Sequence, residues 1–102
     1  MEKIYKLAEG LRKRFPDGND PYQMATRLAE ECGEVASEIS HWENSGVKRL
    51  KYGEPSKEKM AGELKNVLSC VMSIAIYYGV QDELEQSIDS SLLRLKAEGH
   101  ID

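Results

Sequence analysis

The sequence has little of what would cross-link a chain, break its helices or anchor it in a membrane. Its 102 residues include two cysteines, three prolines, one tryptophan and one phenylalanine. Cys32 and Cys70 lie within helical apolar patterns and form no CxxC motif, so we expect buried, reduced thiols and neither a disulfide nor a zinc site. No apolar run approaches the roughly 20 residues that span a bilayer, and the charged start of the sequence lacks a signal-peptide core. We therefore expect a cytoplasmic protein without membrane contact.

An excess of positive charge is also lacking. The 14 lysines and arginines are outnumbered by 18 aspartates and glutamates, which gives a formal net charge of −4. This balance excludes a protein that binds a nucleic-acid polymer by charge alone. Hydrophobic residues make up 40% of the chain, enough for one modest core. The composition therefore predicts a single domain over residues 1–102.

Apolar residues recur at helical spacing along most of the chain, and no strand pattern competes with them. The periodicity predicts helices over roughly 2–15, 21–44, 57–78 and 82–98. Asp20 and Ser56 are placed as N-caps of the second and third helices, and Asp82 and Glu85 have capping-box spacing for the last. The segment 46–55, with two glycines and a proline, is expected to be a loop. The sequence thus predicts an all-α, four-helix antiparallel bundle.

The second predicted helix carries a dense group of carboxylates. Glu30, Glu31, Glu34 and Glu38 lie within little more than two helical turns, and no lysine or arginine follows Arg27 in this helix. Glu31, Glu34 and Glu38 fall within an arc of about 60° beside the apolar stripe. Like charges at this spacing repel each other by about 0.2–0.5 kcal/mol per pair. The group indicates a bound cation, and a solvated acidic surface is the alternative interpretation.

The third predicted helix adds two oxygen ligands at a matching spacing. Glu63 and Asn66 share a face, and the apolar run after Asn66 has no charged residue before Gly79. A carboxylate at the edge of a helical core needs a partner. Facing helices that each present two oxygen ligands can bind Mg²⁺ in a bundle. The two acidic segments together suggest a magnesium site suited to phosphates.

These residues resemble the MazG-like family of all-α nucleoside triphosphate pyrophosphohydrolases, which includes the dCTP pyrophosphatases. The family has EExxE on one helix and ExxD on the next. Here residues 30–34 read EECGE and residues 63–66 read ELKN. The resemblance covers the second and third predicted helices and the segment between them. It implies a bundle whose chains pair as a homodimer or as a homotetramer, a dimer of dimers.

The resemblance also implies a reaction and the residues that perform it. The implied metal ligands are Glu31, Glu34, Glu63 and Asn66, with Mg²⁺ or Mn²⁺ as the cofactor. The implied catalytic candidates are Glu30, Glu34 and Glu38. Activated water attacks the α-phosphorus of a nucleoside triphosphate and releases pyrophosphate and a monophosphate. Asn66 stands where the family has aspartate, so the site has one negative charge fewer.

Basic and aromatic residues after the acidic segment are candidates for binding the nucleotide. The basic candidates for the phosphates are Lys48, Arg49, Lys51, Lys59 and Lys65. His41 and Trp42 are the candidates for stacking on the base. A tryptophan at a helical core position is often plain packing, and a lone histidine is often a satisfied structural residue.

Three functions fit these observations. The first is a house-cleaning hydrolase of ribo- or deoxynucleoside triphosphates. The second is a catalytically weak protein that binds or senses nucleotides, because Asn66 replaces the family's aspartate. The third is a helical dimerisation module whose acidic patch docks a basic partner. The sequence does not set the base or the sugar of the nucleotide.

Overall fold

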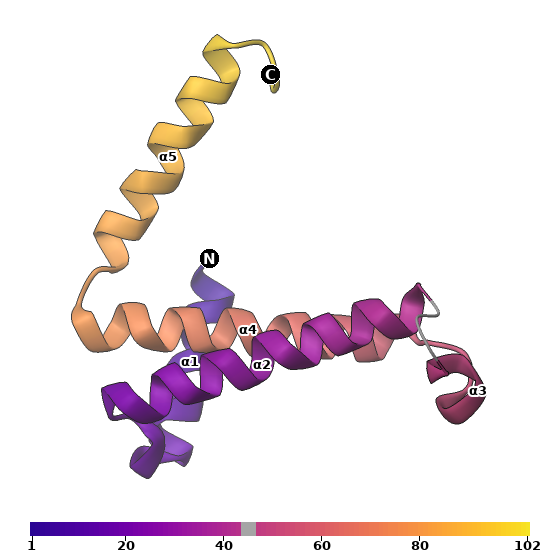
Figure 1. Ribbon diagram of the computed structural model, residues 1–102. Helices are drawn as coiled ribbons and strands as arrows, with labels where there is room; N and C mark the ends of the chain where they lie inside the picture. Colours follow the sequence, from indigo (N-terminus) through magenta and orange to yellow (C-terminus); the bar gives the residue numbers. More distant parts are fainter. Residues whose placement is uncertain (44–46) are drawn as a thin grey trace.

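The computed structural model describes residues 1–43 and 47–102, and within them the chain is all-α (Figure 1). Its elements are α1 (Glu2–Arg14), the 3-10 helix η1 (Pro16–Gly18), α2 (Pro21–Trp42), α3 (Lys48–Tyr52), α4 (Lys57–Tyr78) and α5 (Gln81–Ala97). None of the helices in these two described ranges is both long and apolar enough to cross a membrane.

Three helices pack on one another and form the core. α2 and α4 run side by side in opposite directions, and α1 crosses α4 (Figure 1). The buried apolar residues are small or flexible: Ala8, Met24, Cys70, Met72 and Ala75. The last three of these lie on α4, so the helix with the uncharged run supplies most of the buried apolar residues.

Local signals in the sequence define the starts of α2 and α4. The Asp20 side chain accepts hydrogen bonds from the backbone N–H groups of Tyr22 and Gln23, both at 3.0 Å. The Ser56 hydroxyl accepts one from the N–H of Lys59 at 3.1 Å. Such bonds satisfy N–H groups that have no partner within the helix. Both predicted N-caps are therefore confirmed.

Two predictions for the connecting segments are wrong. The segment 46–55, expected to be a loop, contains the helix α3, because lysine, arginine and leucine favour a helical turn there. Asp82, expected at the cap of the last helix, lies inside its first turn, since α5 begins at Gln81 with Val80 as N-cap. Residue 44, the predicted end of the second helix, lies outside the described residues.

The last helix does not join the other three, which differs from the predicted four-helix bundle. α5 points away from α4 (Figure 1), and every residue after Leu84 is exposed. Gly79 has φ of 65°, and the N–H groups of Gly79 and Val80 donate to the carbonyl groups of Ile76 and Ala75 at 3.2 and 3.0 Å. A left-handed glycine ending of this kind sets the direction of the next segment. Among the described residues, the bundle therefore consists of α1, α2 and α4.

The two cysteines differ in exposure, which corrects the prediction for one of them. Cys70 is buried on α4, but Cys32 on α2 is exposed. Burial raises the pKa of the Cys70 thiol, an effect that Arg27 reduces and that Glu31 and Cys32 increase. Cys32 is exposed because it lines an open groove between α2 and α4 instead of the core.

One arginine ties the three packed helices together. The guanidinium group of Arg12 on α1 donates to the hydroxyl and the carbonyl oxygen of Ser73 on α4, at 2.8 and 3.2 Å. It also lies 3.6 Å from the sulfur of Met24 on α2. Hydrogen bonds from a charged donor each contribute about 1.5–3 kcal/mol. Arg12 is therefore a main link between α1 and the other two helices.

Replacing Arg12 by alanine should lower the free energy of unfolding by about 2 kcal/mol, because Ser73 loses a charged donor. The neighbouring Lys13 is exposed, so Lys13→Ala is the control and should change stability by less than about 0.5 kcal/mol. Urea unfolding followed by far-UV circular dichroism measures both. Equal effects of the two substitutions would contradict the role of Arg12.

Candidate functional site

The predicted metal ligands lie on the two long helices that pack together. They are Glu31 and Glu34 on α2 and Glu63 and Asn66 on α4. Glu34 is exposed and the other three are half-buried. Val35 of α2 and Val67 of α4 line one groove between the helices. The packing therefore brings the two acidic segments to the same level of the helix pair.

The candidate ligands suit Mg²⁺ chemically, but the described residues of one chain do not surround an ion completely. Mg²⁺ takes carboxylate and amide oxygens, and among the described residues Glu31, Glu34 and Glu63 form no salt bridge. In the same part of the chain, no three acidic, histidine or cysteine side chains lie close enough to hold an ion. Mg²⁺ is often held by one or two carboxylates together with substrate phosphates and water. The residues fit such a substrate-dependent site, which stays a prediction.

The three candidate catalytic glutamates have different surroundings. Glu30 is exposed and lines a surface hollow with Tyr22 and Arg27 near the start of α2. Glu34 is exposed one turn further along. Glu38 is only 3% exposed. The structure therefore does not bring the three carboxylates together, and it distinguishes Glu38 from the other two.

Glu38 lines a polar cavity of about 230 Å³ where α2 meets α3 and α4. The cavity is lined by Ser37, Glu38, His41, Lys48, Tyr52 and Lys59. Glu38 Oε2 lies 3.7 Å from Lys59 Nζ, and Glu38 Oε1 lies 3.8 Å from His41 Nδ1. Oε1 is buried and has no hydrogen-bond partner among the described residues. Because an unpaired buried oxygen costs free energy, this atom is suited to accept a hydrogen bond from a ligand.

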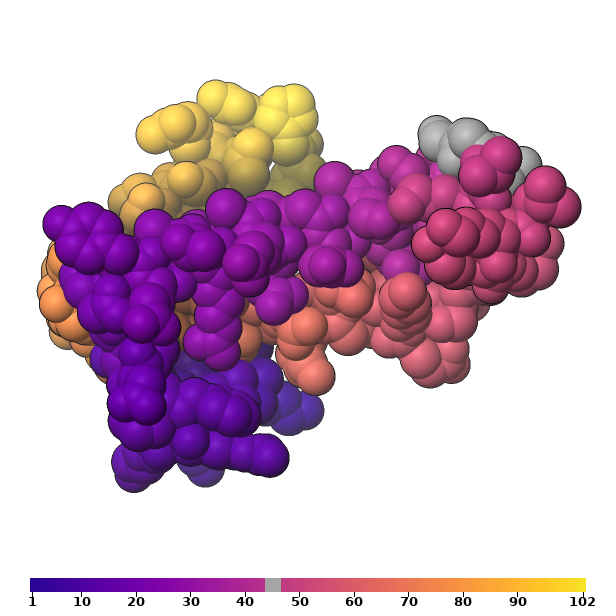
Figure 2. All heavy atoms as spheres, turned by 60° about the horizontal axis from the view of Figure 1, so that its bottom comes forward, coloured from indigo at the N-terminus to yellow at the C-terminus, as the bar shows by residue number. Residues whose placement is uncertain are grey.

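Of the predicted phosphate-binding residues on α3, Lys48 is the one that lines this cavity. Its Nζ donates to the Ser37 hydroxyl at 2.9 Å. Lys51 is exposed, with its Nζ 5.3 Å from the centre of the Tyr52 ring. Figure 2 shows α3 packed against the end of the ridge that α2 forms. This packing is what carries Lys48 and Tyr52 to the end of α2.

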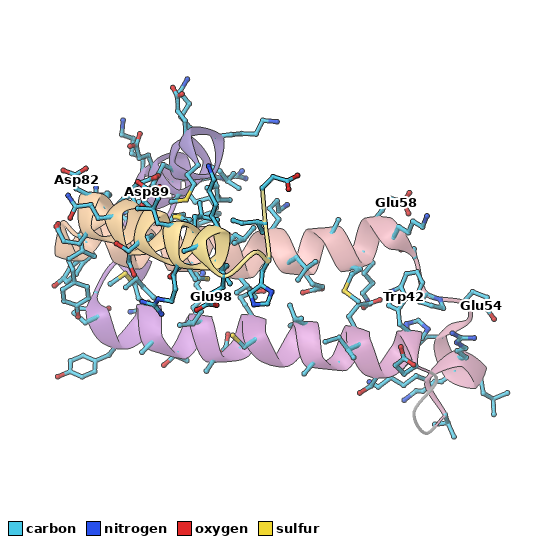
Figure 3. The ribbon with its side chains drawn as sticks, turned by 90° about the horizontal axis from the view of Figure 1, so that it is seen from above. Trp42, Glu54, Glu58, Asp82, Asp89 and Glu98 are labelled. Carbon is cyan, nitrogen blue, oxygen red and sulfur yellow. The ribbon has the colours of Figure 1, made fainter. Side chains whose placement is uncertain are left out.

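The two aromatic candidates lie at the same end of α2. His41 is buried, and its Nε2 donates to the Gly53 carbonyl oxygen at 2.7 Å. Trp42 is half-buried at the end of α2 near the start of α4 (Figure 3), and its indole N–H has no partner among the described residues. Arg49 donates to the Trp42 carbonyl oxygen at 2.6 Å and lies 3.7 Å from Glu54. Arg49 thus holds this corner of the fold in place.

Two residues of the cavity, Ser37 and Tyr52, were not predicted. Tyr52 could not be found from the sequence because its position depends on α3, which was expected to be a loop. The burial of Glu38 did have a signal. It lies seven residues after Glu31, about two turns, so the two share one face of α2 beside the apolar stripe.

Comparison with known proteins adds no relative. No protein-family model, curated protein or solved structure matches this chain. The resemblance to MazG-like enzymes therefore depends on the two short acidic motifs and on the helices that carry them. The residue roles that it implies are proposals.

Replacing Lys59 by methionine should lower the free energy of unfolding by about 1 kcal/mol, because the buried Glu38 carboxylate loses its nearest cation. The effect is moderate because Lys59 is 62% exposed and water screens the pair. Adding Glu38→Gln should recover most of the loss. Lys57→Met, at an exposed position two residues earlier in the chain, is the control. If the effects of Lys59→Met and Glu38→Gln on the free energy of unfolding in urea are additive, Lys59 does not stabilise Glu38.

Proposed function

We propose that the protein is a cytoplasmic, Mg²⁺-dependent nucleoside triphosphate pyrophosphohydrolase. Its substrates are ribo- or deoxynucleoside triphosphates, and its products are a nucleoside monophosphate and pyrophosphate. The strongest support is the antiparallel packing of α2 and α4, which brings the half-buried Glu31, Glu63 and Asn66 to one level of the helix pair. These are oxygen ligands of the kind that Mg²⁺ prefers, and the two glutamates form no salt bridge within the described residues.

The residues that would hold the ion, with the substrate phosphates, are Glu31, Glu34, Glu63 and Asn66. When bound, Mg²⁺ neutralises the triphosphate charge and lowers the pKa of coordinated water. Glu30, Glu34 and Glu38 are the candidates to take the proton of the attacking water. Glu34 is exposed to solvent at the same level of the helix pair as Glu31, Glu63 and Asn66. Glu38, held between Lys59 and His41, is better suited to orienting a bound group.

The polar cavity beside Glu38 supports a binding site for the rest of the nucleotide. Glu38 follows Glu34 by one turn of α2, and Lys59 precedes Glu63 by one turn of α4. The cavity therefore lies about 6 Å along the helix pair from the acidic residues. We assign the phosphates to Lys48 and Lys59, which supply positive charge at its mouth.

The base would meet the apolar corner at the end of α2. His41 and Tyr52 form an edge-to-face pair with ring centres 6.3 Å apart, and Trp42 follows His41 directly. Arg49 and Lys51 lie on α3 beside this corner. A homodimer or homotetramer is part of the proposal, because the enzymes that the two acidic motifs resemble pair their chains.

A second candidate is a protein that binds nucleotides without cleaving them. The observation that favours it is Asn66, a neutral residue at the position of a metal-binding aspartate. An amide oxygen can coordinate Mg²⁺ but adds no negative charge to the site. If catalysis requires the negative charge of an aspartate at position 66, the protein binds nucleotides without cleaving them.

Glu63→Gln should reduce Mg²⁺-dependent pyrophosphate release by about 100-fold or more, because it removes a charged ligand. The assay measures pyrophosphate from a panel of nucleoside triphosphates with Mg²⁺, Mn²⁺ or EDTA. The matched control is Glu58→Gln, at an exposed carboxylate near the start of the same helix (Figure 3). If the Glu31→Ala/Glu63→Ala variant is more stable than the wild type and neither protein responds to Mg²⁺, these carboxylates are solvated surface and the proposed metal site is wrong.

Asn66→Asp should tighten Mg²⁺ binding and raise the rate at limiting Mg²⁺ by about tenfold, since one added charge is worth about 1–2 kcal/mol near a surface. Initial rates over a Mg²⁺ titration measure the effect. An unchanged Mg²⁺ dependence would show that residue 66 is not a ligand. If the wild-type protein cleaves no triphosphate but one raises its Tm with Mg²⁺, and Asn66→Asp restores turnover, the nucleotide-binding function is supported.

A further inference from the structure

The chain exposes far more surface than a folded monomer of its size. A monomer of 11.5 kDa typically exposes about 5,800 Å². This chain exposes 7542 Å². Its radius of gyration is 16.7 Å, against about 13 Å for a compact domain of 102 residues. About 1,700 Å² of surface per chain is therefore left for a partner to cover.

Much of this surface is an apolar stripe along α5. Leu84, Ile88, Leu92 and Leu95 recur at helical spacing and fall within an arc of about 80°. Leu92 is 46% exposed and Leu95 is 38% exposed. Leu93 lies outside this stripe, about 100° around the helix from Leu92. In Figure 3, Asp82 and Asp89 mark the course of α5, and Glu98 follows its last residue. A stripe of this width normally faces a core.

A second apolar surface lies between α2 and α4. It is a groove of about 370 Å³ lined by Cys32, Val35, Leu64, Val67 and Leu68. Leu64 and Leu68 are 47% and 48% exposed. The same face of α4 continues through Val71 to the buried Ala75, near the end of the helix where α5 begins. The groove and the stripe on α5 are therefore two apolar faces that no other described residue of the chain covers.

The helix α5 of the same chain does not reach this groove. The connection consists of Gly79 and Val80, whose N–H groups bond back to α4. The first turn of α5 continues directly, with the Leu84 N–H donating to the Val80 carbonyl oxygen at 2.9 Å. Asp82 and Glu85 lie near Tyr5 of α1, since both add to the effect of burial in raising the pKa of its hydroxyl. These contacts direct α5 away from its own α4.

We propose that α5 of a second copy of this chain lies in the groove between α2 and α4, and that the exchange is reciprocal about a two-fold axis. Covering about 1,700 Å² on each chain would bury about 3,400 Å² in total, within the range of stable homodimers. Each α1–α2–α4 core then gains a fourth helix from its partner. The proposal specifies the pairing surface and, being independent of any nucleotide, can fail separately from the proposed hydrolysis.

The first test is the mass of the full chain without nucleotide or metal, by light scattering over a range of concentrations. We expect twice or four times 11.5 kDa for the wild type. Leu92→Asp should shift the population to the 11.5 kDa monomer, or unfold the chain, because it puts a charge in the apolar interface. Leu93→Asp, outside the apolar stripe of α5, should keep at least the twofold mass. A monomeric wild type, or equal effects of both substitutions, overturns the proposal.

The second test uses the two cysteines as reporters. Cys32 lines the groove, so its reaction with Ellman's reagent should be slow in the wild type and in Leu93→Asp. In Leu92→Asp it should be at least tenfold faster. The buried Cys70 reports whether the fold persists, because it reacts only on unfolding. Fast Cys32 labelling in a dimeric wild type would show that the groove is open. Slow labelling in a monomer would show that α5 closes on its own chain. Either result overturns the proposal.

Discussion

The packing of α2 against α4 is the interaction on which the rest of the molecule depends. α1 is attached to this pair through Arg12, and α3 and α5 extend from its ends. The pair also carries ionisable groups on or near its contact stripe, with Glu38 buried and Glu31 and Glu63 half-buried. Such groups weaken a helix pair unless a cation or a hydrogen-bond donor meets them. The chain therefore gives up stability at the place where we propose that it binds its substrate.

Most of the helices could be predicted from the sequence because their signals are local. Asp20 and Ser56 act on N–H groups two or three residues away, and the apolar period marks the inner faces. The short α3 was missed because five residues are too few for a periodic pattern. The exposure of Cys32 was also missed, because it depends on where the distant α5 lies. That position is decided by the backbone of two connecting residues.

Only part of the candidate site, too, could be predicted from the sequence. The acidic segments of α2 and α4 could be predicted because helical spacing alone places their members on one face. The cavity could not, since it forms only when α3 brings Lys48 and Tyr52 to Ser37 and Glu38. Spacing also does not determine how closely carboxylates from two helices approach. That distance depends on the side chains between the helices, here Val35 and Val67.

The left-handed turn at Gly79 makes α5 a lever. The helix has 17 residues and is about 25 Å long, so a change of only 10° in its direction displaces its far end by about 4 Å. All of its leucines move together in such a change, because the helix is rigid. The precision with which α5 meets another surface is therefore set mainly at Gly79 and Val80, far from the residues that make the contact.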